Sequence, residues 1–440
     1  MLINSICRKL FIPVITLLIA CPLIGHAQEA HPRDYGSTTL KEGLNLENQK
    51  KYEEALTLYK TVHRSDSVYA RVLLRKLYAQ FELKKYEELL PQCEEGIDLN
   101  GEFTSNFLMF KGASLVQLKR YTEGIATYDS IIQVFPGLYQ PHRLRANAFF
   151  SMEDQAGYLA ALKETAIRFP LSQSNQVALA SVAQQEGHIS QASLSLFMAL
   201  MIRWNDDAST DALSDANRLL DGKLDSAPKG VDVSTGDDFK ELDLLLRNRV
   251  GMNKGYKVKP DLNYAFVRQG QFLMNALKDH PKGDGFWTTY YVPFMVQVMD
   301  DGLFEPFVYH ALTNSTDAKV RSLADKNKAA VTKFRDAIYP LVSKYFLNFP
   351  DSVGNEFVSV DHYYYTSEDL RSYGAGGSTE TPTGPWIYYG ANGRISSHGS
   401  YTKDNKRTGV WEEFHPNGKL KRRQVWNDGV ENGPYFTWNT

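Results

Sequence analysis

The sequence predicts a mainly α-helical protein: a solenoid of helical repeats, a helical middle region, and a small C-terminal region of antiparallel β-hairpins. Three observations carry this prediction. The N-terminal half repeats every 34 or 35 residues, the middle places apolar side chains at helical spacing, and the last part repeats every 24 or 25 residues. We expect the helical repeats with a capping helix in residues 38–224, the middle region in 239–350 and the β region in 358–440.

Length and charge limit the number of domains and the kinds of partner. The chain has 440 residues, enough for two or three domains. Its formal net charge is -2, and 23% of its residues are charged. This balance does not favour nucleic acid as a partner, because proteins that bind nucleic acid carry a concentrated basic surface.

Residues 1–27 have the pattern of an export signal peptide. Arg8 and Lys9 supply a positive start, residues 10–24 form an apolar core, and Gly25-His26-Ala27 provides the small residues that a signal peptidase needs. The apolar core is shorter than the roughly 20 residues that a membrane-spanning helix requires. We therefore expect cleavage at the end of this segment and a periplasmic or secreted protein.

A second cleavage pattern stays open. Leu18-Ile19-Ala20-Cys21 resembles the lipobox of bacterial lipoproteins, which would leave a lipid on Cys21 and attach the protein to the outer membrane. The apolar residues after Cys21 favour cleavage after Ala27 instead. In that case Cys93 is the one cysteine of the mature chain, so it forms no intrachain disulfide, and we expect it to be buried.

The repeat of the N-terminal half is in phase at three sets of positions. Its anchors are Ala55, Leu89, Gly124, Tyr158 and Ala192. The positions twelve residues earlier are mostly small, which lets two helices approach closely: Gly43, Leu77, Gly112, Ala146 and Ala180. The positions four residues after each anchor can all be buried: Tyr59, Cys93, Tyr128, Leu162 and Leu196. The pattern predicts two packed helices in each repeat.

This period and pattern resemble the tetratricopeptide repeat, with good copies of its second-helix start at Lys51–Leu56 and Lys85–Leu90. The Trp that the family has early in its first helix is absent. The resemblance covers residues 38–205 and implies helix pairs stacked into a superhelix, whose concave face is lined by the first helices and binds a protein or peptide. The ligand-facing positions that it implies are Arg71, Tyr78, Asn106, Gln117, Arg143, Asn147 and Gln184.

The middle of the chain matches no family motif that we recognise. Residues 210–224 read as a further helix that caps the array, and residues 226–238 read as a linker. From Phe239 to Pro350 apolar side chains recur at helical spacing. This segment either continues the solenoid or forms a separate helical domain.

We find no catalytic motif in the sequence: no His-Glu-x-x-His, no Walker loop and no Gly-x-Ser-x-Gly. We therefore predict no catalytic, cofactor-binding or metal-binding residues. If the protein is an enzyme, its site belongs in the unrecognised middle region. The first side chains to inspect there are Trp287, Tyr290, Tyr291 and His310.

From Val358 onward the sequence pattern is typical of β-strands. Residues 374–385, rich in Gly, Ser, Thr and Pro, read as a loop. Asn392-Gly393 and Asn417-Gly418 then predict two hairpins. Asn-Gly pairs are typical of type I′ turns, which need positive φ at both central residues.

Trp386 and Trp411 occupy equivalent places in this region. Each follows a Gly by two residues and precedes an Asn-Gly pair at the same distance, so we expect both rings to be buried on one side of a sheet. The shared spelling Gly-x-Trp-x-x-Tyr/Phe-x-x-Asn-Gly-x-Leu/Ile resembles the variant MORN repeat, with two full copies and a truncated third in residues 384–440. The resemblance implies stacked hairpins used for binding and scaffolding, in a family that includes antitoxin-like proteins.

Three functions remain open from the sequence. The first is an exported, non-enzymatic binding or scaffold protein of a bacterial envelope, with a protein or peptide partner. The second is an enzyme with its site in the middle region, and the third is an antitoxin-like or immunity partner. A deep pocket with a converging acid and base would favour the enzyme, whereas a broad, shallow apolar patch spanning both repeat regions would favour the scaffold.

Overall fold

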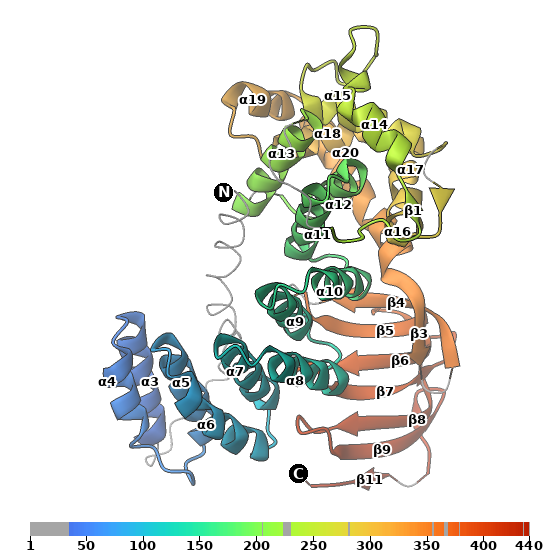
Figure 1. Cartoon of the computed structure of the whole chain (residues 1–440). Helices are drawn as coiled ribbons and strands as arrows, with labels where there is room; N and C mark the ends of the chain where they lie inside the picture. Colours follow the sequence, from blue (N-terminus) through green and yellow to red (C-terminus); the bar gives the residue numbers. More distant parts are fainter. Residues whose placement is uncertain are drawn as a thin grey trace.

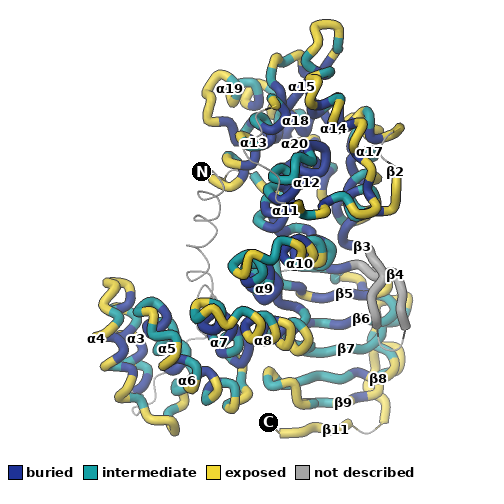
Figure 2. Tube along the Cα trace, in the orientation of Figure 1, coloured by how far each residue is buried: buried dark blue, intermediate teal, exposed yellow. Residues whose placement is uncertain are grey.

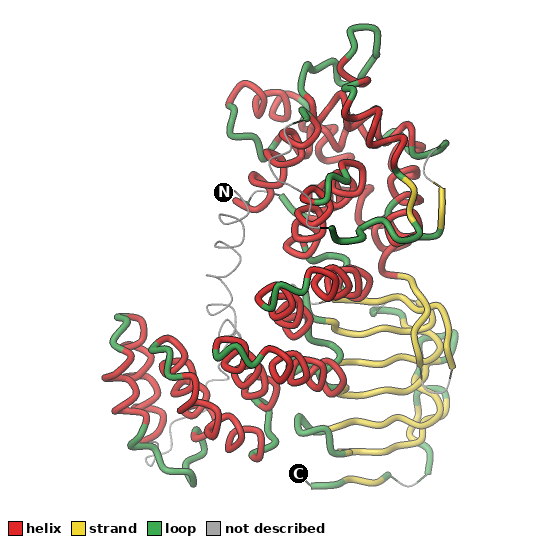
Figure 3. The backbone as a smooth tube through the Cα atoms, viewed as in Figure 1, coloured by secondary structure: helices red, strands yellow, loops and turns green. Residues whose placement is uncertain are grey.

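A computed structural model describes residues 35–204, 206–222, 230–279, 282–353, 356–364, 368–377, 379–433 and 435–439. The export signal predicted in residues 1–27 lies outside the described residues. Figure 3 shows helices through most of the molecule and most of the strands gathered in one large sheet, so the prediction of a mainly α protein with a small antiparallel β region is confirmed. No helix in the described ranges is long and apolar enough to span a bilayer.

Helix pairs form the N-terminal array. Its first helices are α3 (Tyr35–Asn48), α5 (Tyr69–Glu82), α7 (Thr104–Gln117), α9 (Tyr139–Ser151) and α11 (Gln173–Gln185). Its second helices are α4 (Tyr52–Tyr59), α6 (Tyr86–Asp98), α8 (Tyr121–Val134), α10 (Gln155–Arg168) and α12 (Ile189–Ile202). Every anchor of the repeat lies on a second helix and is buried. The positions twelve residues before and four residues after each anchor are buried too.

The turn inside each pair repeats one backbone conformation. Lys50, Lys84, Lys119, Glu153 and Gly187 follow the first helices at intervals of 34 or 35 residues, and each has a positive φ between 60° and 82°. A left-handed residue of this kind ends the first helix and turns the chain into the second. Because four of the five carry a side chain, the packing of the pair holds this conformation without the help of glycine.

Inside the helix pairs, a small residue on one helix faces a large residue on the other, and which helix carries the large one differs between repeats. A Cβ on Gly112 would lie 2.6 Å from Cε1 of Tyr128, so the predicted close contact at this glycine is confirmed. In the second pair the glycine position holds Leu77 and the tyrosine position holds Cys93, and both are fully buried. The expected burial of the cysteine is therefore also confirmed.

The helical middle region extends the core of the array. Its helices are α13 (Asp207–Leu220), α14 (Lys240–Arg247), η1 (Val250–Met252), α15 (Ala265–Ala276), α16 (Phe286–Tyr290), α17 (Val292–Asp300), α18 (Phe304–Leu312), α19 (Ala318–Lys326), α20 (Lys328–Val342) and the π-helical turn η2 (Ser343–Leu347). Their buried side chains join those of α11 and α12 in one hydrophobic cluster that runs from Ala146 to Leu347.

The predicted linker is described only in part. Residues 223–229 lie outside the described residues. The end of the linker forms the short strand β1 (Asp237–Asp238), which pairs with β2 (Lys282–Gly283). The carboxylate of Asp237 accepts from the backbone N–H of Thr288 at 2.7 Å and so caps the start of α16.

The C-terminal strands form one antiparallel sheet and follow each other in chain order. They are β3 (Asn348–Val353), β4 (Glu356–Tyr364), β5 (Leu370–Gly377), β6 (Pro382–Tyr389), β7 (Ile395–Tyr401), β8 (Arg407–Phe414), β9 (Leu420–Asn427), β10 (Val430–Glu431) and β11 (Phe436–Thr437), the last two both paired with β9. The β region begins at Asn348, earlier than predicted. Pro350 is tolerated there because β3 is an edge strand.

The prediction of a loop over residues 374–385 is wrong, because β5 and β6 run through most of it. Gly374 lies against the ring of Trp386 on the neighbouring strand, where a Cβ would collide with the indole. Gly399 has the same relation to Trp411. Glycine is required at both positions because the indole ring occupies the space that a side chain would fill. Both rings are buried, 0% and 2% exposed, as predicted.

The predicted hairpin positions are confirmed, but their turn type is wrong. At Asn392-Gly393 only the glycine has positive φ, and its N–H donates to the Gly390 carbonyl at 2.8 Å. This arrangement fits a type I turn followed by a left-handed glycine, and Asn417-Gly418 repeats it. Because this loop is longer than a two-residue type I′ turn, the asparagine does not have to adopt the strained left-handed conformation. Asp428-Gly429 has positive φ at both residues, as a type I′ turn requires.

The sheet is fixed to the array where α8 meets α9. The Gly137 N–H donates to the Gly393 carbonyl at 3.2 Å, and the Gly137 carbonyl accepts from the Leu370 N–H at 2.7 Å. A small hydrophobic cluster seals the contact with Tyr139, Phe169, Leu370, Tyr373, Ile387 and Tyr389. Figure 1 shows the sheet beside α8–α10 while α3–α6 extend away from it, and Figure 2 shows that burial decreases from β5 toward β11.

Candidate functional site

The ligand-facing positions implied by the tetratricopeptide resemblance are spread over four first helices. They are Arg71 and Tyr78 on α5, Asn106 and Gln117 on α7, Arg143 and Asn147 on α9, and Gln184 on α11. Arg71 forms an ion pair with Glu102 at 3.8 Å, and Arg75 places its guanidinium over the Tyr78 ring. Gln117 is exposed, whereas Asn106 and Gln184 are half-buried.

Arg143 and Asn147 are the two of these residues that the structure brings to one hollow. The hollow measures about 20 Å³, room for a water-sized group, and it is also lined by Tyr139, Ala146, Tyr158, Leu162, Ser174, Asn175 and Ala178. Nε and Nη2 of Arg143 donate to Oε1 of Gln140 at 3.3 and 3.1 Å. The hollow is therefore small and mostly apolar, and Arg143 and Asn147 are among its polar side chains.

The aromatic side chains named for an enzyme site hold the helices together. Trp287 is fully buried, and its indole N–H donates to the Ser195 hydroxyl at 3.0 Å. The hydroxyl of Tyr291 donates to Oε1 of Gln176 at 2.6 Å. These bonds satisfy polar groups inside the core. Tyr290 is half-buried and packs against a neighbouring phenylalanine of α16.

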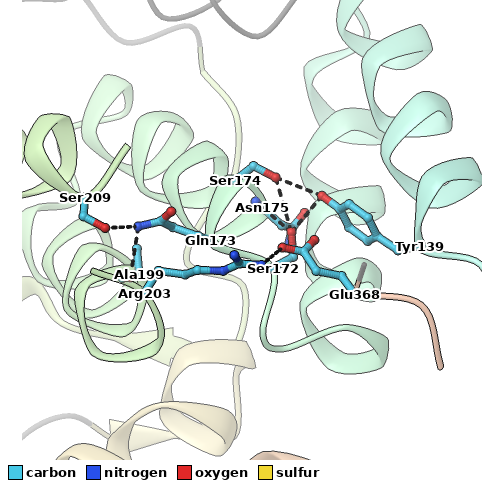
Figure 4. A network of polar contacts seen from close by, with 9 residues as sticks. All are labelled: Tyr139, Ser172, Gln173, Ser174, Asn175, Ala199, Arg203, Ser209 and Glu368. Atoms are coloured by element: carbon cyan, nitrogen blue, oxygen red, sulfur yellow. Dashed lines mark hydrogen bonds and ion pairs between the residues drawn. The ribbon is translucent and has the colours of Figure 1, made fainter. Parts of the chain in front are cut away.

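A polar network lies between the array and the sheet (Figure 4). The Ser172 hydroxyl donates to the Tyr139 hydroxyl at 2.7 Å, and the Tyr139 and Ser174 hydroxyls are 2.9 Å apart. The Glu368 carboxylate accepts from Arg203, whose Nη2 lies 3.2 Å from Oε1, and the Ser172 hydroxyl lies close to this carboxylate. The network thus joins α9, the start of α11, the end of α12 and the turn before β5.

Glu368 is held in a strained backbone conformation. Its φ is +73°, in the left-handed region that costs a residue with a Cβ about 1 kcal/mol. Burial raises the pKa of its carboxyl, while Arg203 and Ser172 act in the opposite direction. Strain of this kind persists only where the surrounding contacts fix the residue, and it is common at binding sites.

A cavity of about 220 Å³ opens beside Glu368, between α12, α20 and the sheet. Most of its lining is apolar or aromatic: Leu171, Met201, Ile202, Trp204, Ile338, Tyr339, Val342 and Tyr364. Three charged side chains complete it: Arg203, Arg335 and Glu368. The array, the middle region and the sheet therefore each contribute to one cavity.

Arg335 is anchored by an aromatic ring and by a histidine. Its guanidinium carbon lies 4.6 Å from the centroid of the Trp204 ring, and its Nε donates to Nδ1 of His310 at 3.3 Å. Nε2 of His310 faces the Leu200 carbonyl at 3.2 Å. These partners assign the proton of the neutral imidazole to Nε2. Burial and the charge of Arg335 lower the pKa of His310 to about 4, so the ring is neutral near pH 7.

The cavity could not be found from the sequence. Arg203 and Glu368 are 165 residues apart, and no motif links them to Arg335. Of the residues around the cavity, only His310 was named, as part of a hypothetical enzyme site. Its two ring nitrogens are occupied by the Arg335 side chain and by backbone, which makes it a support for Arg335.

Comparison with known proteins adds no assignment. No protein-family model matches the chain, and a search of curated proteins finds no match. Within the described ranges, no three His, Cys, Asp or Glu side chains come together in a group that could hold a metal ion.

Proposed function

We propose that this protein is an exported, non-enzymatic binding or scaffold protein of a bacterial envelope, and that its partner is a protein or peptide. The observation that carries the proposal is the placement of Arg143 and Asn147. Both lie on a first helix, and both line the small hollow beside α9. The sheet is fixed to the same helix at its first turn, because the backbone N–H of Tyr139 donates to the Asp369 carboxylate at 2.9 Å.

The repeat architecture supports a surface for binding. We propose that the array belongs with the tetratricopeptide repeats and that the hairpins belong with the variant MORN repeats. The in-phase anchors and left-handed turns support the first assignment, and the matched pairs of Gly374 with Trp386 and Gly399 with Trp411 support the second. Stacked repeats present extended surfaces that hold partners without chemistry.

Export rests on the sequence pattern of residues 1–27. The state of Cys93 is compatible with an oxidising compartment, because its thiol is buried and burial raises its pKa well above the usual range. A thiol of this kind is protonated and inert. Attachment to the outer membrane through a lipid on Cys21 is the alternative to a free protein.

An enzyme is the less supported function. The polar groups of Trp287 and Tyr291 form hydrogen bonds inside the core. Both ring nitrogens of His310 form hydrogen bonds, one with Arg335 and one with the backbone. An antitoxin-like or immunity role rests on the MORN resemblance alone.

Affinity capture tests the proposed function. The tagged mature protein is incubated with an envelope extract of the cells that make it, and the bound proteins are identified. We expect the wild type to retain a defined partner and the double variant Arg143→Ala, Asn147→Ala to lose it, because the variant removes the polar groups of the α9 surface. A partner retained equally by the double variant would contradict binding at this surface.

A matched control separates this surface from the rest of the molecule. Lys328 and Asp336 are exposed on α20, and the double variant Lys328→Ala, Asp336→Ala changes as many side chains as the test variant. It should retain the same partner as the wild type. Circular dichroism of both variants should show unchanged helix content.

A further inference from the structure

The cavity beside Glu368 carries one positive charge that its described lining does not balance. Arg203 and Glu368 neutralise each other in an ion pair, which leaves Arg335 as the remaining charge. Burial lowers the pKa of Arg335, and no acidic neighbour of the described residues offsets that effect. Arg335 is half-buried, so an anion that enters the cavity meets a positive charge that no acidic side chain of the described lining already binds, beside a mostly apolar wall.

The Arg335 guanidinium is also held in place before any ligand arrives. Trp204 covers one of its faces, and Nδ1 of His310 accepts a hydrogen bond from its Nε–H. Among the described residues, neither of its Nη groups donates a hydrogen bond to a protein acceptor. Two parallel donors therefore remain, and a planar guanidinium that is already fixed loses little entropy when it binds.

We propose that this cavity binds a monocarboxylate that carries a compact apolar group. The carboxylate accepts from the two Nη groups of Arg335, and the apolar group lies against Ile338, Val342 and Met201. A single carboxylate balances the single positive charge of the lining. The Glu368 carboxylate does not compete, because it is already paired with Arg203.

The volume sets the size of the apolar group. At about 220 Å³ the cavity exceeds the ~150 Å³ that holds a benzene molecule and falls short of the ~300 Å³ at which sites for drug-sized ligands begin. One ring or a short branched chain fits this range. A nucleotide or another large cofactor does not.

Two sources can supply this chemistry. One is a free aromatic or aliphatic acid, and the other is the C-terminal residue of a peptide chain, which joins a carboxylate to one apolar side chain. The proposal does not depend on partner binding at α9, because the cavity shares no lining residue with the hollow at Arg143 and Asn147.

Isothermal titration of the mature chain tests the proposal with hydrocinnamate, whose ring and carboxylate match the cavity. We expect saturable binding of hydrocinnamate and much weaker binding of hydrocinnamamide, which has the same shape and no charge. Equal binding of acid and amide, or no saturable binding of the acid, would overturn the proposal. This comparison uses the wild type, so it holds whether or not a variant folds.

Two variants locate the contact. Arg335→Met keeps an unbranched aliphatic side chain and removes the charge, so it should weaken hydrocinnamate binding about tenfold or more, as loss of a charged hydrogen bond predicts. Lys333→Met removes an exposed charge from the same helix and should leave binding unchanged. Unchanged binding in the Arg335 variant would overturn the assignment.

The source of the carboxylate is decided by a second titration. The peptide acetyl-Ala-Ala-Phe is compared with its C-terminal amide. Tighter binding of the free-acid peptide than of hydrocinnamate would identify a peptide C-terminus as the ligand. Binding of hydrocinnamate without binding of the peptide would identify a free acid.

Discussion

The guanidinium of Arg203 lies 3.2 Å from the carboxylate of Glu368, although 165 residues separate them in the chain. Arg203 follows α12, and Glu368 lies in the turn that leads into β5. Their ion pair ties the end of the helical array to the sheet. It also forms one wall of the cavity in which Arg335 is left as the unbalanced charge.

Replacing Glu368 by Ala should destabilise the folded protein by about 1–3 kcal/mol. The variant removes a largely buried carboxylate and with it the ion pair to Arg203 that joins the array to the sheet. Urea unfolding measures the change. Glu380→Ala, in the exposed bend between β5 and β6, serves as the control and should change stability far less. Equal effects of the two substitutions would show that the ion pair contributes nothing.

The pH dependence of stability should carry a contribution from His310. Its pKa is lowered to about 4 in the folded state, by burial and by Arg335, from the ordinary value of 6.5. Between these two values the unfolded chain binds a proton that the folded chain does not. Stability is therefore fully present above pH 6.5 and decreases as pH falls toward 4, by at most about 1.4 kcal/mol per pH unit.

The variant His310→Asn should flatten this part of the curve, because it removes the group that takes up the proton. Thermal unfolding between pH 7 and pH 4 measures the slope. The same substitution at the exposed His63 is the control and should leave the slope as in the wild type. Equal slopes in the wild type and His310→Asn would contradict the neutral, supporting role of this ring.

A double substitution tests the exchange of volumes inside the helix pairs. Gly112→Leu should overpack against Tyr128 and cost about 1–3 kcal/mol. Tyr128→Cys should leave a cavity and cost several kcal/mol, about as other large-to-small core changes do. The double variant reproduces the Leu77 and Cys93 pair of the second repeat, so we expect it to be more stable than the sum of the single changes allows. Additive losses in a urea double-mutant cycle would refute the equivalence of the repeats.

Trp411→Ala should cost about 3–5 kcal/mol, because the indole is 2% exposed and its N–H donates to the Ser400 carbonyl at 3.0 Å. Trp438→Ala provides the control, since that ring is 43% exposed at the edge of the sheet, and it should cost less than about 0.5 kcal/mol. Near-ultraviolet circular dichroism during urea unfolding follows the sheet. A buried ring also predicts that iodide quenches Trp411 poorly in the folded protein.

Two glycines in equivalent turns separate docking from turn strain. Gly393 and Gly418 both have positive φ, so an alanine is strained at each. At Gly393 the added Cβ also collides with Leu138 of the array, whereas at Gly418 it meets the flexible end of Arg394. Gly393→Ala should therefore cost more stability. It should also reduce hydrogen-exchange protection of the Gly137 amide, which Gly418→Ala leaves intact.

The sequence was informative where a pattern repeats. The spacing of Ala55, Leu89 and Gly124 predicted the helix pairs, because each buried position recurs at the same place in every copy. The Asn-Gly pairs located the hairpins. The segment of residues 374–385 was misread because glycine signals a loop by composition, while Gly374 belongs to a strand that passes beneath Trp386.

The cavity could not be predicted from the sequence, because its residues do not belong to a repeating pattern. Arg203, Arg335 and Glu368 belong to three regions with no shared period, and they meet only because the array, the middle helices and the sheet pack together. Nothing local to Glu368 predicts its left-handed backbone, which tertiary contacts impose. Single positions of this kind follow from the assembled core and not from a local pattern.

Site-directed photo-crosslinking tests most directly whether the protein works as a binding scaffold. A photoreactive phenylalanine is placed at Asn147 on α9 or, as the control, at the exposed Ala160 on α10. Each variant is irradiated in a whole extract of the cells that make the protein. We predict one adduct of defined mass from position 147 and none from position 160. The absence of an adduct at 147, or the same adduct at both positions, would contradict the account.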